Sequence, residues 1–446
     1  METSRTSSRL DRATVVALVA VVGLALTLRL AWVLTVDTNV DEFADPQWYY
    51  VTAKNVADGH GLTINVPLGG PQRYLAGPGG YEAVRWPPGY SLTLGGFFRV
   101  FGVGLTTAKV VNALAGTATV GLTFLLALRL FGRPVAVVAG VLMAVYPAHI
   151  VWSSVLYSDV VFALPFTAAV VIAVWSGSRP SIMGAAAIGL VLGYAAIIRP
   201  QAVMVLIAVA VMWLLVVPSR KRALLLGGVA ASGVVLWLVP IMAWNTARTG
   251  EPTFISRNFG YNLRIGHAPY STGRYLLPTD LWQPGVTEIR PGALPDEGIA
   301  TRRAIKYALT HPAREAELSA RKVYYLFTTD SDSVAWASNF SYTPIWGSRA
   351  NTDRLGNIAD LSAYIVLLLA FASVPRTFSL KRELGFIWLV LALWVAVHIA
   401  FFGEPRYRLP IQPILMTFAA VALYELYGLL PTSRAVRTDP ESAPAD

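Results

Sequence analysis

Long apolar segments alternate with shorter polar ones along most of this chain. A helix that crosses a bilayer needs about 20 consecutive apolar residues. The segments that reach or approach this length are 13–35, 105–130, 134–155, 158–176, 182–198, 201–217, 223–244, 358–375, 384–402 and 409–428. The pattern therefore predicts an all-α polytopic membrane protein with about ten transmembrane helices.

The composition supports this class of protein. Of the 446 residues, 55% are hydrophobic and only 14% are charged, whereas a soluble domain has about 25% charged residues. The net charge of +10 indicates basic cytoplasmic loops in a membrane protein, so we expect a lipid bilayer and no nucleic acid as partner. The chain has no cysteine, which excludes disulfides, thiolate metal sites and a cysteine nucleophile.

The distribution of Lys and Arg predicts the topology. With the N-terminus inside, every short loop on the cytoplasmic side is basic. These basic positions are Arg5, Arg9, Arg12, Arg129, Arg133, Arg179, Arg220, Lys221, Arg222, Arg376, Lys381, Arg382, Arg434 and Arg437. We expect a multi-pass protein of the plasma membrane with both termini in the cytoplasm, and we interpret the first apolar segment as a retained span rather than a cleaved signal.

The expected organisation follows from these spans. It comprises a cytoplasmic N-terminus (1–12), a transmembrane catalytic module (13–244) that includes an external loop (36–104), a second external loop (245–357), C-terminal transmembrane helices (358–430) and a disordered cytoplasmic tail (431–446). We expect interfacial helices over 89–102 and, as a pair, over 296–329, with Lys322 anchoring the pair to lipid headgroups. Two spans share residues 182–217, so one or both must be short, and we expect an anionic partner for Arg199 between them.

Short motifs along the chain resemble a known family. They are DPQWYYVTAKNVADGHGL, VRWPPGY, YSDVVFALPF, AAIIRPQ, WNTARTGEPTFISRNFGYNLRIGH, THPAREAELSARKVYYLF and EPRYRLPIQP. In this order they resemble the lipid-linked-sugar glycosyltransferases of the GT-C fold, and among these the bacterial members of the protein O-mannosyltransferase and aminoarabinose-transferase superfamily. The resemblance covers most of the chain.

The resemblance implies an inverting membrane glycosyltransferase. Such enzymes move a monosaccharide from a polyprenyl-phosphate carrier to an acceptor glycan, glycolipid or protein on the external face of the plasma membrane. The chemistry needs a carboxylate base for the acceptor and cations for the departing phosphate. The chain has no Walker or Rossmann glycine motif, which favours a lipid-linked donor, with mannosyl and arabinosyl polyprenyl phosphates as candidates. The alternative is a transporter or flippase of polyprenyl-linked sugars, although the two halves show no inverted repeat.

Three acids in the first external loop are candidates for the base. The resemblance favours Asp45, which precedes aromatic residues at the start of a surface helix. The same residue, followed by Pro46, also has the pattern of a helix N-cap. The alternative base is one of the pair Asp41 and Glu42, which could instead be a solvated acidic loop. A divalent metal held by these acids is conceivable, but their spacing matches no metal-binding loop, so we assign no metal ligand.

Arginines on the external motifs are candidates for binding the donor phosphate, because guanidinium groups bind phosphate oxygens in pairs. They are Arg85, Arg199, Arg257, Arg406 and Arg408. We favour Arg199 and Arg406 because both adjoin apolar segments, where an unpaired charge is costly. Each could instead be an arginine whose charge reaches the membrane interface. In relatives a cation directly precedes the Pro-Pro pair, whereas here Trp86 separates Arg85 from it.

The remaining candidates are rings and one acid. Trp48, Tyr49 and Tyr261 are candidates for contact with the sugar, although Trp and Tyr at this depth also form interfacial belts. Asp159, at the start of the fourth span, is a candidate for orienting an arginine or the acceptor, or a simple acid at a helix N-terminus. The five histidines are scattered and predict no zinc site.

Overall fold

The computed structural model describes residues 10–41, 44–64, 81–82, 84–177, 180–250, 252–276, 297–379, 382–426 and 428. The elements are α1 (Arg12–Thr35), α2 (Asp45–Ala57), β1 (Thr63–Ile64), β2 (Tyr81–Glu82), α3 (Gly89–Phe101), α4 (Leu105–Phe131), α5 (Arg133–Val145), α6 (Pro147–Val151), η2 (Trp152–Ser154), α7 (Ser158–Ser176), α8 (Ile182–Ile198), η3 (Pro200–Ala202), α9 (Val203–Val216), α10 (Arg220–Thr249), α11 (Phe259–Gly266), α12 (Glu297–Thr310), α13 (Pro312–Leu326), α14 (Ser331–Asn339), η5 (Ile345–Gly347), α15 (Arg349–Ala372), α16 (Val374–Thr377), α17 (Arg382–Ala400), η6 (Pro405–Ile411) and α18 (Gln412–Leu426), where η marks a 3₁₀ helix. The strands β1 and β2 form one antiparallel pair.

The class of polytopic helical membrane protein is confirmed. Among the described residues, seven helices are long and apolar enough to span a membrane. The pair Arg133–Val145 and Pro147–Ser154, bent by 55°, brings the number to eight if it is counted as one span. The predicted spans 182–198 and 201–217 are shorter apolar helices, as the limited length of that stretch requires. All ten predicted segments are thus helical, while ten complete crossings remain a prediction.

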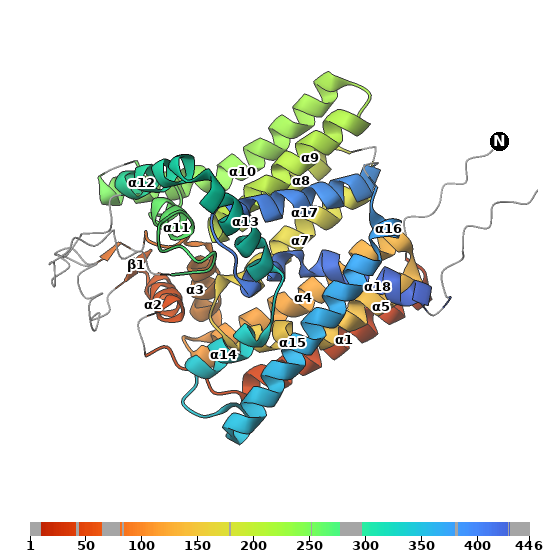
Figure 1. Ribbon diagram of the computed structural model, residues 1–446, viewed down its shortest axis with the longest axis horizontal. Helices are drawn as coiled ribbons and strands as arrows, with labels where there is room; N and C mark the ends of the chain where they lie inside the picture. Colours follow the sequence, from red (N-terminus) through yellow and green to blue (C-terminus); the bar gives the residue numbers. More distant parts are fainter. Residues whose placement is uncertain are drawn as a thin grey trace, which may run out of the picture.

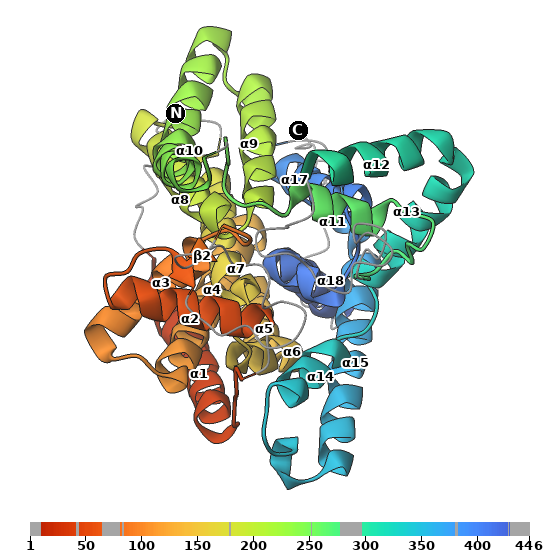
Figure 2. The same cartoon turned by 90° about the vertical axis from the view of Figure 1, so that its left-hand side faces the viewer.

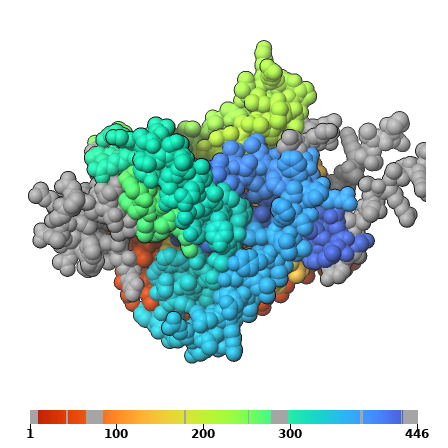
Figure 3. All heavy atoms as spheres, in the orientation of Figure 1, coloured from red at the N-terminus to blue at the C-terminus, as the bar shows by residue number. Residues whose placement is uncertain are grey.

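The helices form a bundle with two distinct ends (Figure 1). At its centre α4 packs against α1, α5, α7 and α18. The helices α2, α3, α11 and α12 gather at the end that we call the pocket end, which faces the viewer in Figure 2, and α16 lies at the opposite end. The helices α12, α13, α15 and α17 cover one side of the molecule (Figure 3). Helices were predicted for α3, α12 and α13; their contact with the membrane surface remains a prediction, as do the domain boundaries.

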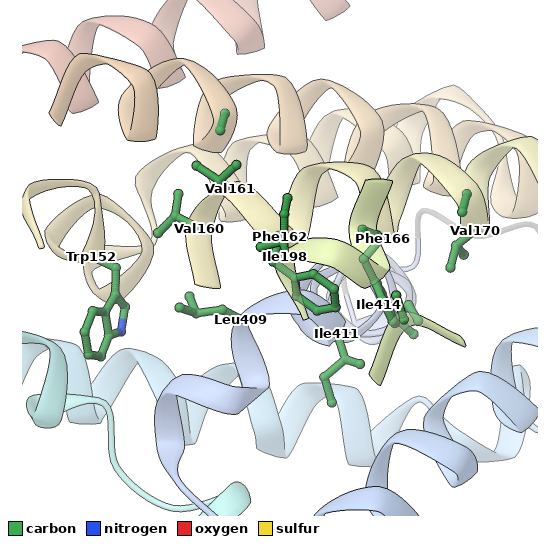
Figure 4. Close-up of a cluster of buried hydrophobic side chains, with 14 of the residues drawn as sticks. Trp152, Val160, Val161, Phe162, Phe166, Val170, Ile198, Leu409, Ile411 and Ile414 are labelled. Atoms are coloured by element: carbon green, nitrogen blue, oxygen red, sulfur yellow. The ribbon is translucent and has the colours of Figure 1, made fainter. Parts of the chain in front are cut away.

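The core of the bundle lies around α7. Its buried rings Phe162 and Phe166 pack against Trp394 of α17, with ring centroids 6.1 and 5.1 Å from the indole. Ile411 and Ile414 approach the same cluster from η6 and α18 (Figure 4). Because lipid tails are as apolar as these side chains, close packing rather than removal from water stabilises this contact. The core thereby fixes α17 and η6, which carry part of the pocket wall.

Small residues let α8 lie directly against α10. A Cβ on Gly189 would stand 2.1 Å from the carbonyl oxygen of Ala230, and one on Gly233 would stand 2.7 Å from the backbone of Gly189. Only glycine permits two backbones to come this close. The contact holds the short helix α8, and therefore Arg199 at its C-terminal end, against the 30-residue helix α10.

A buried arginine supports the bend between α5 and α6. Pro147 has no N–H to donate to Met143, so the last carbonyls of α5 need other partners. Arg29 of α1 is fully buried and donates to the carbonyl oxygens of Met143 and Ala144 at 3.2 and 3.1 Å. The guanidinium also donates to Ala25 at 3.2 Å and lies 3.2 Å from His149 Nδ1. Arg29 thus acts as a side-chain cap for the broken span.

We expect Arg29→Met to destabilise the protein strongly. The substitution keeps an unbranched side chain but leaves two buried carbonyls without donors, each costing about 1–3 kcal/mol. The melting temperature in detergent should fall by several degrees. Arg133→Met is the control, because that exposed arginine only pairs with exposed Asp11 and should change little. Equal melting temperatures for the two variants would contradict the capping role.

Candidate active site

A pocket of about 1280 Å³ lies at the pocket end. Its lining comes from the start of α2, the segment 85–87, the start of α7 and the turn after α8. The segments 252–262 and 272–275, the end of α17 and the segment 404–407 also line it. Segments far apart in the sequence therefore meet around one cavity.

Asp45 lies at this cavity with an uncommitted carboxylate. It is the first residue of α2, the N-cap position belongs to Ala44, and no side chain caps this helix. The prediction that Asp45 is a helix N-cap is therefore wrong, because the helix begins at Asp45 itself, one residue earlier than a cap at Asp45 requires. Among the described residues its carboxylate has no hydrogen bond or ion pair. The group is free to take part in chemistry.

The environment of Asp45 shifts its acidity in two opposing ways. Burial, the largest effect, raises the pKa of Asp45 above its ordinary value. The positive charges of Arg406, Arg85 and Arg199, in decreasing order, lower this pKa in part. Desolvation disfavours the carboxylate, whereas nearby guanidinium groups favour it. The outcome is a stronger base than an ordinary exposed aspartate.

Two aromatic rings hold Arg85. Its guanidinium carbon lies 4.6 Å from the ring centre of Trp86 and 5.6 Å from that of Tyr261. A cation held by ring faces keeps its N–H donors for other partners. Trp48 lies behind this arrangement, buried and with its ring centre 4.7 Å from that of Trp86. It is not part of the pocket wall, so its predicted contact with sugar finds no support.

Arg406 is held in the same manner. Its guanidinium carbon lies 4.4 Å from the ring centre of Tyr157 and 5.1 Å from that of Tyr407. One N–H group makes a long contact of 3.4 Å with the Tyr407 hydroxyl, and the other terminal nitrogen is buried without a partner in the described part of the chain. Such an orphaned donor at a cavity suits an anionic ligand.

Arg199 has the anionic partner that the sequence predicts. Its guanidinium donates to Asp159 at 2.6 Å and to the Ser158 hydroxyl at 3.1 Å. Asp159 is almost fully buried and does not form part of the pocket wall, whereas Arg199 does. Asp159 therefore holds Arg199 at the cavity, in agreement with the prediction that it orients an arginine.

Three further candidates line the cavity: Arg257, Tyr49 and Tyr261. Tyr49 packs edge-on against Tyr90, with ring centres 5.0 Å apart. Burial raises the pKa values of Tyr49 and Tyr261 far above the ordinary tyrosine value, so both phenols stay neutral and can donate hydrogen bonds.

Of the two alternative bases, the structure places only Asp41, and it lies away from the cavity. Asp41 is exposed, accepts a hydrogen bond from the Tyr342 hydroxyl and does not line the pocket. Glu42 lies outside the described residues. Among the residues that the structure describes, no group of three or more His, Cys, Asp or Glu side chains could hold a metal ion. The suggested cluster of Asp41, Glu42 and Asp45 includes Glu42 and therefore lies partly outside the described residues.

Arg408 requires a correction. It is almost fully buried, pairs with Asp330 at 2.7 Å and donates to the carbonyl oxygens of Leu326 and Thr328, both at 3.1 Å. These partners cap the end of α13 and occupy the guanidinium, and Arg408 does not line the pocket. We therefore remove it from the expected phosphate-binding set.

Lys322 also differs from its prediction. Instead of reaching lipid headgroups, its side chain is fully buried. Its ammonium group donates a hydrogen bond to the Ile399 carbonyl at 2.8 Å. His267 lies beside it, 2.9 Å from the Ala400 carbonyl and 2.8 Å from Glu315. The two side chains satisfy the last carbonyls of α17. These hydrogen bonds hold the end of α17 in place, directly before the segment that carries Arg406.

Other residues of the cavity were missed by the sequence analysis. They are Tyr157, Ser158, Gln201, Arg274, Asp332, Trp336, His398, Glu404 and Tyr407. Tyr157 and Ser158 directly precede Asp159 within a recognised motif, so the motif could have revealed them. Arg274 lies in an irregular loop segment that carries no periodicity, and nothing in the sequence pairs it with residues some 60 and 130 positions away.

We expect Lys322→Met to change how stability depends on pH. Burial lowers the pKa of Lys322 to about 8, from 10.5 for a free lysine. Between these values the unfolded chain binds more protons than the folded one, so the unfolding free energy rises with pH. The melting temperature of the wild type, minus that of the variant, should increase from about pH 8 to pH 10. A difference that stays constant across this range would contradict a desolvated ammonium.

The chain was compared with known families, sequences and structures. A family model described as dolichyl-phosphate-mannose-protein mannosyltransferase matches residues 85–244, which include the candidates Arg85, Asp159 and Arg199. The resemblance to the mannosyltransferase superfamily is confirmed over this stretch. A search of curated proteins finds no match.

Solved structures match the chain over almost its whole length. The oligosaccharyltransferase of Archaeoglobus fulgidus, in complex with Zn and sulfate, matches at 14% identity over 92% of this chain and 49% of its own, with a TM-score of 0.51. AglB from the same organism, with an inhibitory peptide and a dolichol-phosphate, matches at 15% identity over 94% and 50%, with a TM-score of 0.47. ArnT from Cupriavidus metallidurans, bound to undecaprenyl phosphate, matches at 15% identity over 91% and 78%, with a TM-score of 0.42.

The first of these matches confirms the predicted GT-C type of fold. The chain spans about half the length of the archaeal proteins that it matches.

Proposed function

We propose that the protein is an inverting glycosyltransferase that moves a monosaccharide from a polyprenyl-phosphate carrier to an acceptor. One observation carries this proposal. The carboxylate of Asp45 has no partner among the described residues, although the charges of Arg406, Arg85 and Arg199 all act on it. A base next to guanidinium groups with free N–H donors suits attack by a hydroxyl and departure of a phosphate.

The reaction follows from this arrangement. Asp45 takes the proton from the acceptor hydroxyl as its oxygen attacks the anomeric carbon of the donor. The bond from that carbon to the phosphate oxygen breaks, and the electron pair leaves with the phosphate. The guanidinium groups of Arg85, Arg199 and Arg406 stabilise the added negative charge. One displacement inverts the anomeric configuration.

The apolar part of the pocket wall supports a lipid-linked donor. Ile198, Val397 and Phe401 line the cavity at the ends of α8 and α17, where a polyprenyl chain can leave it toward lipid. The matching family is described by a dolichyl-phosphate-mannose donor. We propose that the pocket faces the exterior and both termini face the cytoplasm, because the basic loops belong to the opposite ends of the spans.

We expect Asp45→Asn to reduce transfer by about 10²- to 10⁴-fold, the usual contribution of a general base. Membranes with each variant are incubated with labelled mannosyl- and arabinosyl-phosphoryl polyprenols, and loss of sugar from the lipid is measured. The melting temperature should change little, because the carboxylate makes no hydrogen bond among the described residues. Asp41→Asn is the matched control and should retain activity.

The same assay separates the two proposed classes of function. Full activity of Asp45→Asn would remove Asp45 as the base. If the wild type consumes no donor but labelled lipid changes leaflet, the transferase proposal fails and a flippase takes its place. Glu42→Asn completes the set of alternative bases.

We expect the pH profile to report the acidity of Asp45. Its raised pKa predicts that kcat/KM falls on acidification at a pH above the ordinary aspartate value of about 3.9. Arg85→Gln removes a charge that lowers this pKa, so the acidic limb should move to higher pH. Arg257→Gln is the control, since Arg257 lines the pocket but is not among the main charges acting on Asp45. An unmoved limb in Arg85→Gln would refute the electrostatic coupling.

A further inference from the structure

Arg274 forms a second polar group in the pocket, built from three distant segments. Its guanidinium donates to Asp332 at 2.6 Å and to Glu404 at 2.9 Å, and its carbon lies 5.3 Å from the ring centre of Tyr325. The backbone N–H of Tyr275 also donates to Glu404, at 2.9 Å. Arg274, Asp332 and Glu404 all line the cavity, and the reaction described above uses none of them.

The three side chains of this group differ in how many of their polar atoms already make hydrogen bonds. Both carboxylate oxygens of Glu404 accept hydrogen bonds, from Arg274 and Tyr275. Asp332 accepts through one oxygen only, and one terminal nitrogen of Arg274 has no partner among the described residues. The Arg274 and Asp332 side chains are 37% and 24% exposed, so a ligand in the cavity can reach them. A free acceptor therefore lies beside a free donor.

The charge of the group selects the class of ligand. Two carboxylates around one guanidinium leave no excess positive charge, so the group would not attract a phosphate. A half-buried acceptor next to a donor, however, matches two neighbouring hydroxyls of a sugar ring. The rings of Tyr275 and Trp336 also line the cavity and provide apolar surface for the carbon atoms of such a ring.

The backbone links this group to the proposed phosphate site. The N–H of Gly403 donates to the carbonyl of Gly273 at 2.9 Å, next to Glu404 and Arg274. A Cβ on Gly403 would stand only 2.0 Å from the Lys322 carbonyl oxygen, so this segment is packed tightly against α13. Arg406 follows two residues after Glu404. The two polar groups thus keep a fixed separation, as two ends of one ligand require.

We propose that Arg274 and Asp332 bind two neighbouring hydroxyls of the sugar on the donor and so determine which sugar the protein transfers. This inference rests on the proposed function and adds the residues that determine its specificity for the donor sugar. The cavity of about 1280 Å³ exceeds the usual range for one small ligand, which ends near 1,000 Å³, so it can hold a donor head group together with an acceptor.

The test compares a mannosyl-phosphoryl polyprenol with its forms deoxygenated at C2, C3, C4 or C6, and kcat/KM is measured for donor consumption. We expect the wild type to use the deoxy form that lacks a bound hydroxyl at least about tenfold less well than the parent. In Asp332→Asn, kcat/KM for the parent donor should fall to nearly the value for this deoxy donor. The variant would then no longer prefer the parent donor over the deoxy donor. A purely structural residue would slow all donors alike and leave the preference unchanged.

Asp360→Asn is the matched control. Asp360 accepts from the backbone N–H groups of Asp330 and Ser331, at 2.7 and 2.6 Å, and does not line the pocket. The substitution loosens the same end of α14 and should keep the preference. If Asp332→Asn still prefers the parent donor over the deoxy donor as strongly as the wild type does, the inference is overturned. Loss of this preference in Asp360→Asn overturns it as well. In both cases consumption of the donor by the wild type still supports the proposed function. If the wild type consumes neither mannosyl nor arabinosyl donors, the proposed function fails and this inference with it.

Discussion

The candidate active site depends on keeping the carboxylate of Asp45 near three guanidinium groups without forming an ion pair with any of them. An aspartate and an arginine in direct contact would form an ion pair and leave no free base or donor. Here ring faces hold Arg85 and Arg406, and Asp159 holds Arg199. The three positive charges therefore lower the pKa of Asp45, while its carboxylate forms no ion pair with the described residues. Tyr261, Tyr157 and Asp159 lie far in the sequence from the arginines that they hold, so this separation depends on how the bundle folds.

The apolar pattern predicted most of the fold because membrane helices follow from length and hydropathy. All ten predicted spans are helices, and even the short pair around Arg199 was expected from the limited length of 182–217. The bend at Pro147 was not predicted. A proline interrupts a helix, but the sequence does not show that Arg29, over a hundred positions away, supplies the missing hydrogen bonds.

The site was predicted where a motif and a physical need coincide. Arg199 required an acid, and Asp159 in another motif provides it. Sequence could not separate Arg406 from Arg408, two residues apart in one motif, because the 3₁₀ helix turns one toward the cavity and the other toward Asp330. Nor could it show that Lys322 points inward, since that depends on how α13 docks on the end of α17. Both outcomes are decided by tertiary contacts, which periodicity does not record.

In the proposed reaction, the same separation of charges links donor binding to the strength of the base. The guanidinium groups lower the pKa of Asp45 in the free pocket. A bound donor phosphate would neutralise part of their charge, so the opposing effect of burial would then dominate. Asp45 would hold a proton more tightly once the donor is in place, which makes it a better base for the acceptor hydroxyl. A pocket in which Asp45 paired directly with one arginine would lose this coupling, because the ion pair would fix the acidity of the carboxylate.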